Sequence, residues 1–157
     1  MQNITPCLWF NFNAEEAVRH YLSVFKDGKI LELSRYGDAT PALSDKALMI
    51  VFEIQGQRLQ ALNGGPTFPL TEAISLSVSC DTQAEIDRLW AQLSAGGSTS
   101  QCGWLKDKFG LSWQIVPSVL GRLLTDADTA KVARVTAAFM KMTKFDIAGL
   151  EQAYAGP

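Results

Sequence analysis

The sequence predicts an α+β fold in which two similar βαβββ modules are followed by a helical extension. Two amphipathic helix patterns, at residues 13–25 and 82–93, share the same spacing of caps and apolar positions. An apolar, strand-like segment precedes each helix, and two similar segments, which begin at Gly56 and Gly110, end the two repeats. Strand, helix and strands therefore recur in one order, which indicates a repeated module.

The first module opens with the apolar segment ITPCLWFNF, which is typical of a strand, and continues with NAEEAVRHYLSVF. In the second segment Asn13 is expected to cap a helix, and Glu16 completes a capping box three residues later. The apolar face of this helix is formed by Ala17, Val18, Tyr21, Leu22 and Phe25.

The second module repeats this plan. In AISLSVSCD apolar residues alternate with serines, as in a strand with one buried face. In TQAEIDRLWAQL, Thr82 is the expected cap and Glu85 its capping-box partner, and Gly96 and Gly97 end the helix. The apolar stripe comprises Ile86, Leu89, Trp90 and Leu93.

The segments GQRLQAL and GLSWQIV are the predicted last strands of the two modules. They share a glycine, a large apolar residue before a glutamine, and two apolar residues after it. Their offset is 54 residues (56 to 110), whereas the helix caps are offset by 69 (13 to 82). The second module is therefore expected to be 15 residues shorter (69 less 54) between its helix and its last strand.

Residues 118–157 are predicted to form a helical extension outside the repeat. SVLGRLL is typical of a short helix, and residues 129–142 of a longer one with an apolar stripe. Asp146 is expected to cap a last helix. The apolar residues of the two longer helices are Val132, Val135, Phe139, Met142, Ile147, Leu150 and Tyr154.

Composition narrows the class of protein. With 157 residues, 47% hydrophobic and 19% charged, the chain is expected to fold into a globular domain. A net charge of -2 offers no basic surface for nucleic acid, and the longest apolar run is too short to span a membrane. The N-terminus lacks the basic region of a signal peptide, and three cysteines show no metal-binding spacing. We therefore expect a reduced, cytoplasmic protein.

The motifs NAEEAVRHYLSVF, ALNGGP, CDTQAEIDRLWAQLSAGG and QCGWLKDKFGLSWQIVP resemble the PhnB-like branch of the vicinal oxygen chelate (glyoxalase/bleomycin-resistance) superfamily. The resemblance extends over nearly the whole chain, including the tail KMTKFDIAGLEQAY. It implies that modules 4–64 and 73–117 form one domain, residues 1–117, as a pair of half-barrel sheets around a cavity. It also implies a homodimer, with the extension 118–157 packing at or near the interface.

Metal-dependent members of this superfamily place ligands on the first and last strands of each module. By the repeat offsets those positions fall on Pro6, Gln60, Ser75 and Gln114. Proline offers no ligand, and hydroxyl and amide oxygens bind divalent metals weakly compared with imidazole, thiolate or carboxylate. The only histidine, His20, belongs to the first helix, outside the barrel. We therefore expect a protein without metal or cofactor.

The PhnB-like branch also carries the label 3-demethylubiquinone-9 3-methyltransferase. An S-adenosylmethionine enzyme of the usual kind needs a glycine-rich turn between a strand and a helix. Gly64-Gly65 precedes a proline-containing loop and Gly96-Gly97 follows a helix, so neither pair stands in that position. The sequence therefore argues against methyltransferase activity.

Strand alternation predicts which side chains line the cavity. Trp104 and the first strand would supply apolar and aromatic walls, and glutamines and serines a few neutral hydrogen-bonding groups. Cys7 and Cys80 are assigned to core faces, and Lys106 and Asp107 to a solvated turn. The expected lining comprises Leu8, Phe10, Gln60, Ser75, Ser77, Cys102, Trp104 and Gln114. An alternative is that these polar groups satisfy one another in a filled barrel.

Two functions remain open at this point. The first is a metal-free protein that binds a small aromatic or amphipathic organic molecule in the cavity. The second is an enzyme of unassigned reaction, either assisted by Cys102 or by ordered water, or resembling the metal-dependent lyases, isomerases and dioxygenases of the superfamily. Cys102 would need a neighbouring base or cation to become a nucleophile, and it could equally be an apolar wall residue.

Overall fold

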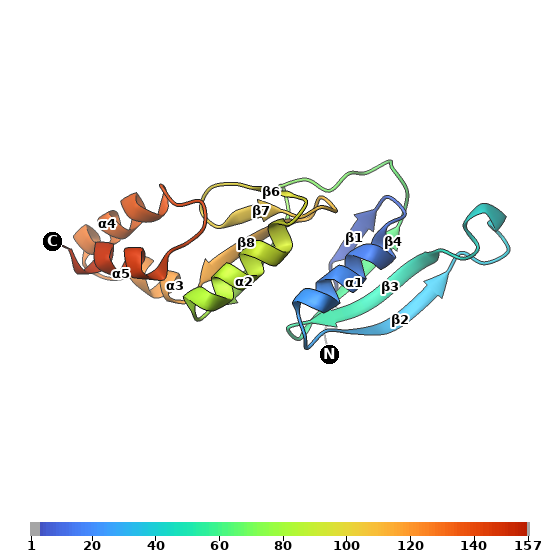
Figure 1. The fold of residues 1–157 in the computed structure, drawn as a ribbon, viewed down its shortest axis with the longest axis horizontal. Coiled ribbons are helices and arrows are strands. Elements are labelled where there is room, and N and C mark those ends of the chain that lie inside the picture. Colours follow the sequence, from blue (N-terminus) through green and yellow to red (C-terminus); the bar gives the residue numbers. More distant parts are fainter. Residues whose placement is uncertain (1–3, 157) are drawn as a thin grey trace. The chain divides into compact units, whose positions relative to one another are not determined.

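The computed structural model describes residues 4–156, and the chain divides into two compact units, residues 1–70 and 71–157. Each unit contains one four-stranded mixed sheet and one helix inserted after its first strand (Figure 1). The predicted α+β fold with tandem βαβββ modules is therefore confirmed. That residues 1–117 form a single domain stays a prediction.

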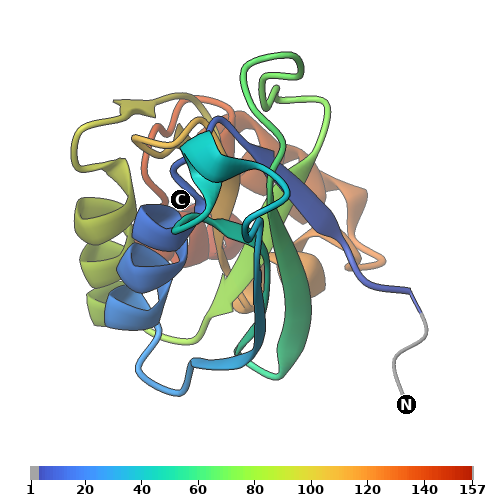
Figure 2. The same ribbon diagram turned by 90° about the vertical axis from the view of Figure 1, so that its right-hand side faces the viewer.

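Unit 1 contains the first module. Its elements are β1 (Cys7–Phe10), α1 (Ala14–Val24), β2 (Lys29–Arg35), the 3-10 helix η1 (Pro41–Leu43), β3 (Ala47–Ile54) and β4 (Gln57–Asn63). The strand order is β1-β4-β3-β2, with β1 parallel to β4 and the other neighbours antiparallel. Figure 2 shows α1, in blue, along one side of these strands.

Unit 2 contains the second module and the extension. The module comprises β5 (Ser75–Cys80), α2 (Gln83–Ser94), β6 (Ser98–Thr99), β7 (Trp104–Lys106) and β8 (Ser112–Pro117). Its order β5-β8-β7-β6 reproduces that of unit 1, with β5 parallel to β8. The predicted shortening lies in β6 and β7, which have 2 and 3 residues against 7 and 8 in β2 and β3.

The extension forms α3 (Val119–Leu124), α4 (Thr129–Phe139) and α5 (Ile147–Ala155) within unit 2. Asp128 caps α4 by accepting from the backbone N–H of Ala130 and Lys131. The longer helix predicted to reach residue 142 ends at Phe139. Among the helices of residues 4–156, none has the length and apolar character of a membrane span.

The segment between α4 and α5 is tied to the second module. The Cys102 and Gly103 N–H groups donate to the carbonyls of Met142 and Thr143, each at 2.8 Å. The Gln83 side chain of α2 donates to the Phe145 carbonyl at 3.0 Å and accepts from the Ile147 N–H at 2.9 Å. Because Phe145 is also buried, the extension is part of the core of unit 2.

Each sheet buries one face against its own helix. In unit 1 the rings of Tyr21 from α1 and Phe52 from β3 stack 6.3 Å apart, and both side chains are fully buried. In unit 2 the helix α2 packs on β7 and β8 and buries Ile86, Leu89 and Leu93. We call the opposite side of each sheet its open face.

The two helices begin differently, although the sequence predicts the same cap for both. Thr82 accepts from the Glu85 N–H at 3.2 Å and caps α2 as expected. Asn13 makes no side-chain cap, and the Ala14 N–H donates instead to the buried Asn63 of β4 at 2.9 Å. Asn63 also donates to the Ala47 carbonyl at 2.8 Å, so one amide joins the start of α1 to two strands.

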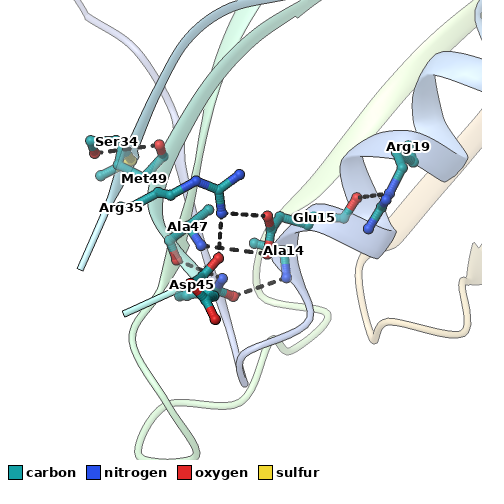
Figure 3. A network of polar contacts seen from close by, with 9 residues as sticks. Ala14, Glu15, Arg19, Ser34, Arg35, Asp45, Ala47 and Met49 are labelled. Carbon is teal, nitrogen blue, oxygen red and sulfur yellow. Dashed lines mark hydrogen bonds and ion pairs between the residues drawn. The ribbon is translucent and has the colours of Figure 1, made fainter. Parts of the chain in front are cut away.

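An ion pair reinforces this corner of unit 1 (Figure 3). Glu15 in the first turn of α1 lies 3.4 Å from the Arg35 guanidinium at the end of β2 and accepts from the Ala47 N–H at 3.4 Å. The Arg35 guanidinium also donates to the Asp45 carbonyl. These contacts hold together the helix start and the strand ends, so this part of unit 1 has a structural role.

Candidate functional site

The open face of unit 2 is built from three neighbouring strands. In the parallel pair β5–β8, Ser75 is opposite Ser112 and Ser77 is opposite Gln114. From β7, Trp104 is opposite Gln114 and Lys106 is opposite Ser112. Since paired residues share a face, these six side chains lie on one side of the sheet. The residues between them, including Trp113 and Ile115, are buried on the α2 side.

Polar contacts link these side chains to one another. The Gln114 amide donates to the Ser75 hydroxyl at 2.9 Å, which brings together two residues that the sequence assigns to the cavity. Lys106 forms an ion pair with Glu72, which lies in the segment before β5. The hydroxyl of Ser112 has no hydrogen-bond partner among residues 4–156, although Ser112 is only 2% exposed.

A pocket of about 350 Å³ opens beside this row of residues. Its wall combines one tryptophan, several hydroxyls and the Lys106–Glu72 pair. The lining residues are Glu72, Ser98, Ser100, Gln101, Trp104, Leu105, Lys106 and Ser112. The volume lies within the range of pockets that hold small organic molecules.

The open face of unit 1 has a different character. Cys7 is opposite Gln60, which is opposite Val51, and Trp9 is opposite Leu62, which is opposite Met49. The Trp9 indole donates to the Gly65 carbonyl at 2.8 Å, and its ring meets Phe68 edge-on at 5.0 Å. The segment after β4 thus folds against the tryptophan, and the face is mainly apolar.

The placement of the first strand is wrong in the sequence analysis. Leu8 and Phe10 are 3% and 2% exposed on the side of α1, whereas Cys7, which was assigned to the core, is exposed on the open face. The cause is the turn between β1 and α1. It contains one more residue than the turn before α2, and Phe12, with φ 59°, adopts the left-handed conformation there.

This extra residue changes the correspondence between the modules. Gln60 pairs with Cys7, but Gln114 pairs with Ser77, so the first strands are offset by 70 residues (7 to 77), one more than the helices. Pro6 is therefore not the counterpart of Ser75. It is exposed and uses its backbone carbonyl to accept from the Gln60 N–H at 2.9 Å.

Cys102 is also misplaced in the sequence analysis. It lies in a turn before β7 with φ 57°, not on the strand, and it is absent from the lining of the pocket. Its thiol lies 3.7 Å from the Phe139 carbonyl at the end of α4, and its backbone N–H binds Met142. Cys102 therefore connects the module to the extension, and Trp104 does not share a face with it.

The residues predicted to form a solvated turn have other roles. Lys106 is the last residue of β7 and lines the pocket. Asp107 is 3% exposed and accepts hydrogen bonds from the N–H groups of Phe109 and Leu111 and from the Trp113 indole, at 2.9–3.0 Å. The carboxylate therefore organises the β7–β8 connection from inside the fold.

Sequence reasoning missed part of the pocket. Lys106 stands two residues after Trp104, so strand alternation alone would have put both side chains on the same face. Ser112 lies on the predicted cavity face but was not selected as a lining residue. Glu72 lies in an irregular segment, for which no periodic signal exists.

The donor groups on the open faces do not fit a divalent metal ion. Residues 4–156 contain no group of three or more His, Cys, Asp or Glu side chains that could hold one. The side chains opposite one another are Cys7 with Gln60 and Ser77 with Gln114, which are weak ligands apart from the thiol. Burial raises the pKa of the Cys7 thiol, which opposes formation of the thiolate that a metal would need.

An S-adenosylmethionine site of the usual kind does not fit this fold either. Gly64 and Gly65 follow β4 and lead into an irregular segment, and Gly96 and Gly97 lie between α2 and β6. Neither pair connects a strand to a helix, where a glycine-rich turn would hold the cofactor.

Comparisons with known proteins agree with this architecture. Residues 2–116 match the family model described as 3-demethylubiquinone-9 3-methyltransferase, so α3–α5 lie outside the matched region. A putative 3-demethylubiquinone-9 3-methyltransferase, PhnB protein, from Bacillus cereus is 33% identical, with a TM-score of 0.69. That match covers 74% of this chain and 99% of the other.

Two further structures support the same fold. Protein PA1353 from Pseudomonas aeruginosa is 26% identical over 74% of this chain and 98% of its own, with a TM-score of 0.63. The fosfomycin resistance protein FosX from Listeria monocytogenes is 17% identical over 80% and 98%, with a TM-score of 0.56, and shows similarity of fold alone. No curated protein sequence matches the chain. The chain belongs to the 3-demethylubiquinone-9 3-methyltransferase family, PhnB-like proteins with the vicinal oxygen chelate fold.

Proposed function

We propose that this protein is a metal-free small-molecule-binding protein of the glyoxalase/bleomycin-resistance type. The observation that carries the proposal is the pocket of about 350 Å³ on the open face of unit 2, where Trp104 stands beside hydroxyl groups. An aromatic wall supplies apolar contact, and a small number of polar groups orient the ligand. Gln114 and Ser75, joined by their hydrogen bond, offer further polar atoms on the same face.

The chemistry of the donor groups supports the metal-free part of the proposal. A cation on these faces would lose water ligands and gain mainly neutral oxygens, so desolvation opposes binding. We expect elemental analysis of the purified protein to find less than one zinc, nickel, manganese or iron per chain. Chelators should leave the melting temperature unchanged. One tightly held transition metal per chain would refute this part of the proposal.

The geometry does not favour a reaction at Cys102. The thiol is engaged with a backbone carbonyl, and the only histidine of the chain, His20, lies on α1 in unit 1. A nucleophilic cysteine needs a base or cation that stabilises its thiolate. We therefore expect Cys102→Ser to leave ligand binding unchanged.

A thermal-shift experiment with aromatic and amphipathic compounds tests the proposal. A ligand present at 100 times its dissociation constant should raise the free energy of unfolding by about 2.7 kcal/mol. Trp104→Leu should abolish the shift. Trp90→Leu, a change of the same kind on α2, is the matched control and should retain it. A shift that survives Trp104→Leu would place the ligand elsewhere.

The assembly and location belong to the same proposal. We expect a homodimer, as the family resemblance implies, and light scattering after size-exclusion chromatography measures its mass. The three cysteines are free thiols, which supports a reduced, cytoplasmic protein. A monomer at micromolar concentration would contradict the dimer.

A further inference from the structure

The pocket in unit 2 contains a cation that is held by a carboxylate from an irregular segment. Lys106 projects from β7 with its side chain 35% exposed, whereas the Glu72 side chain is 63% exposed. The lysine is fixed on the sheet by its strand, but the glutamate lies outside regular secondary structure, between β4 and β5. The ion pair therefore joins a positioned cation to a carboxylate with few other constraints.

A second polar group stands beside the cation without a use in the fold. Ser112 is the cross-strand neighbour of Lys106, and its hydroxyl is buried with no hydrogen-bond partner within the described residues. A buried hydroxyl is nearly always hydrogen-bonded in a native protein. Because Ser112 lines the pocket, a bound ligand could accept the bond that the protein does not provide.

Trp104 supplies the third element of the pocket. It lies on the same strand as Lys106, two residues earlier, so its ring and the ammonium group lie on the same face. The pocket lining contains no arginine. One lysine and one free hydroxyl suit a group with a single negative charge, whereas phosphate sites commonly use several donors or a helix N-terminus.

We propose that the pocket binds a small aromatic carboxylate, with its charged group between Lys106 and Ser112 and its ring against Trp104. In the ligand-free protein Glu72 occupies the place of that carboxylate and leaves it when the ligand binds. The volume of about 350 Å³ accommodates a molecule of one or two rings. This inference rests on the proposed function, because it names the ligand class of the same pocket.

A matched pair of probes tests the charge requirement. Calorimetric titration with 1-naphthoate and with 1-naphthamide compares a carboxylate with a neutral group of similar shape. We expect the acid to bind at least about tenfold more tightly, since a charge-assisted hydrogen bond is stronger than a neutral one. Lys106→Met should remove this difference and leave amide binding unchanged.

Two further variants test the other groups. Ser112→Ala should weaken acid binding by about threefold to tenfold, because one hydrogen bond to the carboxylate is lost. Glu72→Gln should strengthen acid binding by about twofold to fivefold, since the competing surface ion pair is weak, with no change for the amide. Lys144→Met is the control, because Lys144 is paired with Asp87 in the same unit and lies outside the pocket lining.

The results separate this inference from the proposed function. Equal binding of acid and amide, unchanged by Lys106→Met but lost in Trp104→Leu, would overturn the carboxylate inference and leave the binding function standing. Absence of binding by both probes would overturn both. Weaker acid binding by Glu72→Gln would overturn the displacement of Glu72. If Lys106→Met is unfolded by circular dichroism, Ser112→Ala and Glu72→Gln still decide the question.

Discussion

The two modules share one topology but differ in how they close their turns and in what they present on their open faces. Unit 1 connects β3 to β4 through Gln55 and Gly56, which both have positive φ, so backbone conformation alone closes the hairpin. Unit 2 connects β7 to β8 around the buried Asp107 carboxylate. The same strand order thus rests on backbone geometry in one case and on a side chain in the other.

The open faces differ in the same way. That of unit 1 carries Trp9, Leu62 and Met49, whereas that of unit 2 carries serines, Gln114 and Lys106. Strand order requires only apolar side chains on the helix side, so the other face is free to vary. The comparison teaches that the repeat predicts the fold, while the ligand chemistry is specific to one module.

The largest expected effect separates the two connections. Asp107→Ala should lower the free energy of unfolding by about 3–5 kcal/mol, because three buried N–H donors lose their acceptor. Gln55→Ala, in the corresponding connection of unit 1, should change it by less than about 0.5 kcal/mol. Urea unfolding of both variants measures the difference. Similar values for the two would show that Asp107 does not organise its turn.

A second contrast concerns two glycines with positive φ. Gly103 has φ 78°, and a Cβ there would lie 2.5 Å from the Phe145 ring and 2.7 Å from the Ile115 carbonyl. Gly103→Ala should therefore cost about 2–4 kcal/mol from strain and overpacking. Gly56 has φ 71°, and a Cβ there would meet no atom within 4 Å, so Gly56→Ala should cost about 1 kcal/mol.

The same pair of variants tests the extension. If Gly103→Ala is no worse than Gly56→Ala, the contact between Phe145 and the β7 turn does not stabilise unit 2. Thermal unfolding followed by tryptophan fluorescence distinguishes the two variants.

A smaller effect is expected at the helix starts. Thr82→Ala should lower the free energy of unfolding by about 1 kcal/mol, because the Glu85 N–H loses its acceptor. Asn13→Ala should change it by less than about 0.5 kcal/mol, since Asn13 makes no side-chain cap in α1. Chemical denaturation of the two single variants checks this. Equal losses would indicate that Asn13 caps α1 in solution.

Periodicity and caps were sufficient to predict the duplicated topology. The helix positions, the last strands and the shortening of the second module all follow from patterns within the sequence. The side chains on the open face of unit 2 were also predictable, since β5 alternates without interruption. Ser75, Ser77, Trp104 and Gln114 lie together there, as the alternation predicts.

The errors arose where a single residue changes the phase of a strand. The one extra residue at the β1–α1 turn moved Leu8 and Phe10 to the core, and offsets measured between helices do not detect it. The buried Asn63 cap and the Asp107 acceptor depend on contacts between separate elements, which short sequence motifs do not encode. The positive φ of Cys102 likewise follows from its contact with the extension.

The smallest expected effect is a pH dependence within unit 2. The Tyr154 hydroxyl donates to Asp126, and together with the Asp128 N–H it lowers the pKa of that carboxyl below its ordinary 3.8. A lowered pKa in the folded state means that the unfolded chain binds the proton more readily. The contribution to stability is therefore present above about pH 4 and is lost as the pH falls through the folded pKa.

Tyr154→Phe isolates this contribution, because it removes the hydroxyl and keeps the ring that Lys131 and Arg122 approach. The variant should be slightly less stable than the wild type at pH 7, and the difference should shrink steadily below about pH 4. Urea midpoints of both proteins between about pH 7 and pH 3 measure it. A difference that stays constant over this range would mean that Tyr154 stabilises unit 2 through packing and not through the charge of Asp126. The effect should also be reduced by salt, because Asp126 lies at the surface.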